Sequence, residues 1–143
     1  MSIFIQSIFA FFAIVAFSIV INAPKRCLVI NGLLGMAGWA AYLFAARYIG
    51  SQLAATFISG LILAIASHIL ARALKSPVTT FLIPAILTIV PGAGMYQTVY
   101  YLFLSDVDNA LYSLIYTIGA AGAIAIAIFF VDAFVIAIKR IVR

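Results

Sequence analysis

Residues 77–104, PVTTFLIPAILTIVPGAGMYQTVYYLFL, decide how this chain folds. The stretch is apolar enough to lie in a bilayer, but Pro84, Pro91 and the glycines that follow interrupt the hydrogen bonding of an ordinary membrane helix. In hydrocarbon an unpaired backbone N–H or C=O group costs several kcal/mol, so irregular backbone persists only where it faces protein or a wet cavity. We therefore predict a membrane helix broken at Pro84 and at Pro91-Gly92. A kinked but continuous helix is the alternative.

A Pro-Gly interruption inside a membrane span is a candidate ligand site. Broken spans of secondary transporters place half-helix ends, with their partial charges and free backbone groups, near the membrane midplane. On a helix Tyr96 and Tyr100 share one face, with Gln97 beside them. Anchoring in the membrane interface is the alternative role for these tyrosines. The candidate substrate or translocation residues are Pro84, Thr88, Pro91, Gly92, Gly94, Tyr96, Gln97 and Tyr100.

Composition places the whole chain in a membrane. Of its 143 residues, 68% are hydrophobic and 8% are charged, against about a quarter charged in a soluble domain. A hydrocarbon core of about 30 Å takes about 20 apolar residues per helix, which limits the chain to roughly four to six spans. The long apolar runs exclude a β-barrel, whose strands alternate apolar and polar residues. The sequence predicts an all-helical, polytopic membrane protein, with one transmembrane domain over residues 1–143.

Five spans account best for the apolar runs and the charges. The expected spans are residues 3–21, 27–46, 53–70, 78–104 (broken) and 110–138. One side of the membrane then carries Lys25, Arg26, Arg72, Lys75, Lys139, Arg140 and Arg143, and the other side carries Arg47, Asp106 and Asp108. By the positive-inside rule, this bias predicts an outside N-terminus and a cytoplasmic C-terminus.

Small residues on two spans indicate faces for close helix packing. Asn31 lies beside the first of these faces, and a membrane amide is expected to hydrogen-bond across a helix interface. The expected packing residues are Asn31, Gly32, Gly35 and Gly38 in the second span, and Gly119 and Gly122 in the last.

Asp132 and His68 are the candidates for proton or ion coupling. An acidic residue inside a span is expensive and indicates contact with a proton, an ion or a substrate. The alternative for Asp132 is a position near the cytoplasmic end, paired with a loop cation in the region of Lys139. His68 could relay protons because histidine titrates near neutral pH. Its alternative is an interfacial position beside the basic loop that contains Arg72.

No enzyme, metal centre or cofactor is expected. The single His, the single Cys and the three acidic residues are dispersed over different segments, without a nucleophile–base pair or metal-ligand spacing. A channel would be marked by rings of like polar groups from symmetric copies, which the pattern does not require.

Residues 72–96, RALKSPVTTFLIPAILTIVPGAGMY, resemble the threonine/serine exporter family, in particular its short membrane component. The family pattern is a basic residue, two prolines, and an I-I-P-L-V-P-G-like run followed by a tyrosine. Thr88 stands where many members have a further proline, which points to a milder break or to different substrate contacts. The matching positions are Pro77, Pro84, Val90, Pro91, Gly92 and Tyr96.

The resemblance implies export of threonine, serine or a similarly small polar metabolite such as a dicarboxylate, driven by proton exchange. It also implies a bacterial cytoplasmic membrane and a larger membrane subunit of the same family as partner, because the short component works beside such a subunit in split exporters. Five spans are few for a complete translocation path, so we expect a larger partner, a homo-oligomer or both. We expect no nucleic-acid partner. The alternative is an accessory subunit that stabilises a partner transporter without contacting the substrate.

Overall fold

The computed structural model of this chain describes residues 3–141, without the side chains of Lys139 and Ile141, and its regular elements in that range are all helices. Four helices are long and apolar enough to cross a membrane: α1, α2 together with the short helix before it, α3 and α6. The prediction of an all-helical membrane protein is therefore confirmed. The elements are α1 (Ile3–Val20), the 3-10 helix η1 (Lys25–Cys27), α2 (Leu28–Ile49), α3 (Gln52–Ala73), α4 (Thr79–Ile86), α5 (Gly92–Phe103) and α6 (Val107–Ile141).

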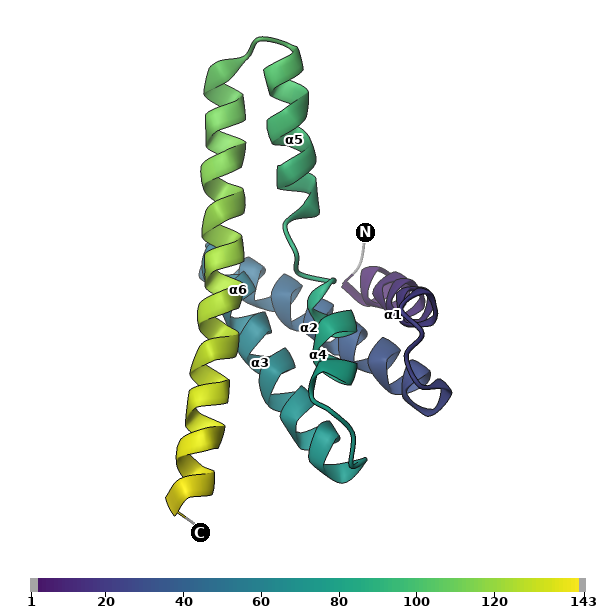
Figure 1. The fold of residues 1–143 in the computed structure, drawn as a ribbon. Helices are drawn as coiled ribbons and strands as arrows, with labels where there is room; N and C mark the ends of the chain where they lie inside the picture. Colours follow the sequence, from purple (N-terminus) through teal and green to yellow (C-terminus); the bar gives the residue numbers. More distant parts are fainter. Residues whose placement is uncertain (1–2, 142–143) are drawn as a thin grey trace.

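The helices form a packed body from which one hairpin projects. In the body α2 packs against α1 and α3, α4 packs against α2 and α3, and the C-terminal part of α6 lies along α3. The hairpin consists of α5 and the N-terminal half of α6, and it extends upward from the other helices in Figure 1. With 35 residues, α6 is about 52 Å long, which exceeds the hydrocarbon thickness of about 30 Å.

Local capping residues place the helix ends within a few residues of the expected ends of the spans. Gly50 takes a left-handed conformation with φ 72° and ends α2 three residues beyond the expected limit. Ser51 then caps α3 by accepting a hydrogen bond from the Ala54 N–H at 3.4 Å. Asp106 accepts hydrogen bonds from the backbone N–H and the side-chain amide of Asn109. α6 therefore begins at Val107, within the turn expected between the spans at residues 105–109.

The segment predicted to be the fourth span, residues 78–104, is interrupted between α4 and α5, after Pro84 rather than at it. Pro84 lies inside α4, which continues to Ile86. The chain then makes tight i→i+3 hydrogen bonds, such as Ile89 N–H to Ile86 C=O at 2.9 Å. At Pro91, with φ −77° and ψ 56°, it makes an inverse γ-turn closed by the Gly92 N–H and the Val90 C=O at 2.8 Å.

The main core lies where α2, α3 and α4 meet α6. Phe81 of α4 and Leu63 of α3 are fully buried at its centre, and the lone cysteine, Cys27, is buried with them. The buried members are Cys27, Leu34, Leu63, Ala71, Phe81, Ala85, Ile89 and Ile124. This core holds the first half of the broken span firmly against its neighbours.

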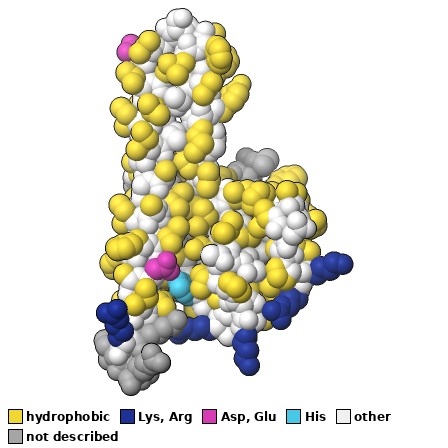
Figure 2. Space-filling view, viewed as in Figure 1, with side chains coloured by type: hydrophobic (Ala, Val, Ile, Leu, Met, Phe, Trp, Pro, Cys, Tyr) yellow, Lys and Arg dark blue, Asp and Glu magenta, His cyan; other side chains and the backbone are white. Residues whose placement is uncertain are grey.

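Cationic side chains gather at one end of the molecule. Figure 2 shows lysine and arginine side chains at the lower end, near the C-terminus, and an acidic side chain at the tip of the hairpin. The Arg26 guanidinium donates a hydrogen bond to the Ser76 hydroxyl at 3.0 Å, so the α1–α2 and α3–α4 turns lie side by side. Arg143 and the Lys139 side chain lie outside the described residues. The orientation in the membrane stays a prediction.

Candidate functional site

A cavity of about 420 Å³ lies beside the break in the fourth span. Thr88 and Leu87 line it from the break, Trp39 lines it from α2, and the remaining lining comes from α1. Those α1 residues are Gln6, Phe9, Ala10, Ala13 and Ile14. Neither Gln6 nor Trp39 stood out in the sequence, because their position at the cavity depends on how α1 and α2 pack against the break.

The break leaves backbone groups available. No described residue donates a hydrogen bond to the carbonyl oxygens of Leu87, Thr88 and Ile89. In the first turn of α5 the N–H groups of Ala93 and Gly94 likewise have no acceptor within residues 3–141. The Thr88 hydroxyl donates to the Ala85 carbonyl at 2.8 Å. An interrupted helix of this kind offers acceptors from one half and donors from the other.

The other candidate substrate residues lie away from this cavity. Tyr96, Gln97 and Tyr100 are exposed on α5, where the two tyrosine rings stack with their centroids 5.9 Å apart. Pro84 is buried inside α4, Pro91 is half-buried at the γ-turn, and Gly92 is exposed. Gly94 is buried against Thr117 of α6 so closely that a Cβ on Gly94 would clash with the Thr117 hydroxyl. Of the candidate side chains, the structure therefore brings Thr88 to the cavity and leaves the tyrosines on the hairpin.

His68 and Asp132 form a pair between α3 and α6. The His68 Nε2 lies 2.6 Å from the Asp132 Oδ1, with 17% of the histidine side chain and 47% of the aspartate side chain exposed. The two side chains are adjacent on the surface in Figure 2, near the cationic end. In the sequence His68 and Asp132 are separate candidates, and it is the fold that makes them a pair. The signal was available, because the third and last spans run in the same direction and place both residues near their basic ends.

Asn31 of α2 links α1 and α4, and it bonds to the Thr80 carbonyl, which Pro84 leaves without its usual helical donor. Its side-chain amide donates to the Ser18 hydroxyl and to the Thr80 carbonyl, each at 3.2 Å. In a regular helix the Thr80 carbonyl would accept from the N–H of residue 84, and proline has none. Asn31 therefore supplies the missing donor and allows α4 to continue through Pro84.

The small residues of α2 pack against two helices. A Cβ at Gly32 would lie 2.6 Å from Val15 of α1, and a Cβ at Gly38 would lie 2.6 Å from Leu63 of α3. Gly35 fits against Ile14 in the same way. The two glycines of α6 differ, since a Cβ at Gly119 would touch Leu53 at 3.3 Å, whereas one at Gly122 would meet no atom within 4 Å.

Comparison with known protein families gives a match over most of the chain. A sequence model of a protein family, described as Threonine/Serine exporter, ThrE, matches residues 6–134. No curated protein and no solved structure matches the chain. The matched range contains both the break in the fourth span and the His68–Asp132 pair.

Proposed function

Because the chain belongs to the threonine/serine exporter family, we propose that it is the small membrane subunit of a secondary transporter. The transporter exports threonine, serine or a similarly small polar metabolite from bacteria across the cytoplasmic membrane. Proton movement through the His68–Asp132 pair drives the export. The observation that carries this proposal is the break between α4 and α5, which offers free backbone groups beside a cavity.

The break has the chemistry that a zwitterionic amino acid needs. The free carbonyls of Leu87, Thr88 and Ile89 can accept hydrogen bonds from an ammonium group. The first turn of α5 offers N–H groups and the positive end of a helix dipole to a carboxylate. A cavity of about 420 Å³ lies within the usual range for small-molecule sites, about 300–1,000 Å³. Thr88 adds a hydroxyl that can exchange its bond to Ala85 for one to the substrate.

The His68–Asp132 pair supplies a proton-dependent charge. A protonated His68 beside an ionised Asp132 is neutral as a pair, and loss of the proton leaves one negative charge. Charges inside a span are expensive, so proton binding favours the states in which this part of α3 and α6 is shielded from water. The exchange of a proton for the substrate therefore requires the charge of this pair to change by one unit.

The hairpin supports the role of a subunit rather than a complete transporter. Gly94 is the one buried residue among the twelve of α5, and α6 is the helix against which α5 packs extensively. Phe103 is 85% exposed, and most of the other exposed side chains of α5 are also hydrophobic. We assign this surface to a larger membrane subunit of the same family, with a second copy of this chain as the alternative.

Substrate contact at the break is tested by Thr88→Val, with Thr98→Val as the matched control. Both threonines donate to a backbone carbonyl at 2.8 Å, but Thr98 lies on α5 and does not line the cavity. In membrane vesicles loaded with radiolabelled threonine, we expect Thr88→Val to raise the KM about fivefold, the value of one lost hydrogen bond, at unchanged protein level. Thr98→Val should leave the KM unchanged. If substitutions at the break act only by lowering the amount of assembled protein, the accessory role is correct instead.

Proton coupling is tested by Asp132→Asn, with the exposed Asp108→Asn as control. Efflux from the wild type should accelerate when the outside is made more acidic. Asp132→Asn should abolish this dependence, because without the carboxylate a proton on His68 would leave an uncompensated positive charge inside the span. Asp108→Asn should behave as the wild type. Unchanged efflux and unchanged pH dependence in Asp132→Asn would remove the pair from the mechanism.

A further inference from the structure

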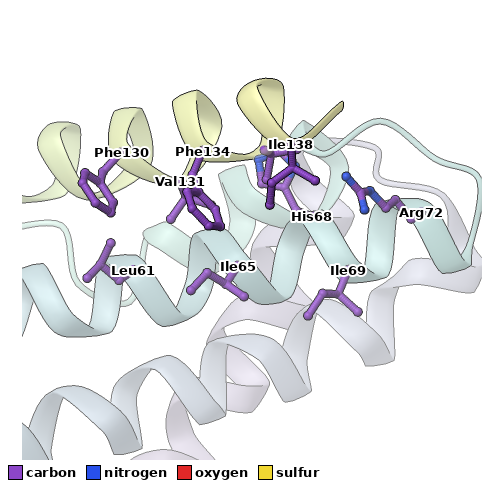
Figure 3. A pocket seen from close by; sticks show the side chains of 10 residues that line it. Leu61, Ile65, His68, Ile69, Arg72, Phe130, Val131, Phe134 and Ile138 are labelled. Carbon is purple, nitrogen blue, oxygen red and sulfur yellow. The ribbon is translucent and has the colours of Figure 1, made fainter. Parts of the chain in front are cut away.

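A lateral groove runs between α3 and α6 at the cationic end of the molecule. Its volume is about 430 Å³, and Figure 3 shows apolar side chains from the two helices facing each other along it, with Arg72 at one end. His68 lines the groove one helical turn before Arg72. The lining residues are Leu61, Ile65, His68, Ile69 and Arg72 of α3, and Phe130, Val131, Phe134, Val135 and Ile138 of α6.

The groove opens to the outside of the chain and has the depth of one membrane leaflet. Ile69 and Phe134, which line it from opposite helices, are each 62% exposed. Leu61 and Arg72 are eleven positions apart on α3, which corresponds to about 16 Å along the helix. Half of a hydrocarbon core of about 30 Å is about 15 Å. An acyl chain that begins at the level of Arg72 would therefore end near the midplane at Leu61.

Charge at the groove is arranged with the cation outermost. The Arg72 guanidinium forms neither a hydrogen bond nor an ion pair with any residue that the structure describes. The acidic group of this region, Asp132, is held by His68 one turn further from the cationic end. Arg140 is exposed on the last turns of α6. A negative group placed beside Arg72 thus meets a cation that no described residue neutralises.

We propose that this groove binds an anionic phospholipid of the leaflet at the cationic end, with one acyl chain between α3 and α6 and the phosphate on Arg72. Basic pockets between membrane helices recognise anionic headgroups in this way, and the apolar lining excludes a zwitterionic amino acid. The lipid site is separate from the cavity beside Thr88. The proposal does not depend on which substrate the protein transports.

The test is native mass spectrometry of the purified full chain, in its native assembly, with added dioleoyl-phosphatidylglycerol or dioleoyl-phosphatidylcholine. The wild type should bind the anionic lipid more tightly. Arg72→Gln should weaken phosphatidylglycerol binding about fivefold, which corresponds to about 1 kcal/mol for one cation at the membrane surface. It should weaken phosphatidylcholine binding less, because the choline cation of that lipid already neutralises its phosphate. Arg72→Lys should retain the preference.

Lys75→Gln is the matched control, because it removes the same charge at the same end from a residue that does not line the groove. An equal loss in Lys75→Gln would show diffuse surface attraction and overturn the site. Ile65→Trp, which fills the groove, should weaken binding of both lipids, and unaltered binding would also overturn the site. A cross-link between Ile65→Cys and another protein chain in native membranes would assign the groove to a protein partner instead.

Discussion

The two halves of the broken span, α4 and α5, are alike in sequence character and opposite in environment. Four of the eight residues of α4 are buried, and α4 packs against α2 and α3. Among the twelve residues of α5 one is buried, and α5 packs on α6 in a hairpin that projects from the body. The first half is anchored within this chain, whereas the second half presents its apolar surface outward.

This difference shows that hydrophobicity alone does not determine packing in a membrane. Lipid tails are as apolar as the side chains, so helices associate through close packing and interhelical hydrogen bonds. α4 has both, through the buried Phe81 and through the bond from Asn31 to Thr80. α5 approaches α6 closely at Gly94, which packs against Thr117. The following substitutions separate these contributions.

The largest expected difference is between Phe81→Ala in α4 and Phe103→Ala in α5. Phe81 is 0% exposed and Phe103 is 85% exposed, so only the first substitution leaves a cavity in the protein. We expect Phe81→Ala to lower the free energy of unfolding by about 3 kcal/mol, measured by denaturant titration in detergent micelles. Phe103→Ala should change it by less than about 0.5 kcal/mol. Equal losses in the two variants would contradict the difference in anchoring.

An intermediate effect is expected at the contact between Gly94 of α5 and Thr117 of α6. A Cβ on Gly94 would clash with the Thr117 hydroxyl, whereas a Cβ on Gly92 meets no atom within 4 Å. Gly94→Ala should therefore cost about 2 kcal/mol through overpacking, and Gly92→Ala should be close to neutral in the same titration. Adding Thr117→Ala to Gly94→Ala should restore most of the stability. A double variant as unstable as Gly94→Ala would show that the contact with Thr117 is not the cause.

The smallest effect is the coupling between Asn31 and Pro84. Asn31→Leu removes the donor to the Thr80 carbonyl, and we expect a loss of about 1 kcal/mol, typical of an interhelical hydrogen bond in a membrane. In a Pro84→Ala background residue 84 has an N–H that can donate to Thr80, so the same substitution should cost less. A double-mutant cycle measures this difference. Strict additivity would mean that Asn31 does not replace the donor that Pro84 lacks.

Composition and the Pro-Gly pattern predict the helical membrane fold and the broken span, because apolar runs and missing N–H donors act locally. They do not predict that α4 continues through Pro84, since the replacement donor to the Thr80 carbonyl comes from Asn31, 49 positions from Thr80. They place His68 and Asp132 near the basic ends of their spans, but they do not predict that α3 and α6 are neighbours. Tyr96 and Tyr100 share a face as expected, but periodicity cannot say whether that face meets a cavity or the outside.

The most direct test of the account is cross-linking of the two halves of the broken span in native membranes. Phe103→Cys on α5 and Ile83→Cys on α4 both give exposed thiols, whereas the native Cys27 is buried. With a bifunctional maleimide and mass analysis, the account predicts that position 103 links to another membrane protein chain and that position 83 does not. Equal linking at both positions, or a fully active single chain without any linked partner, would contradict it.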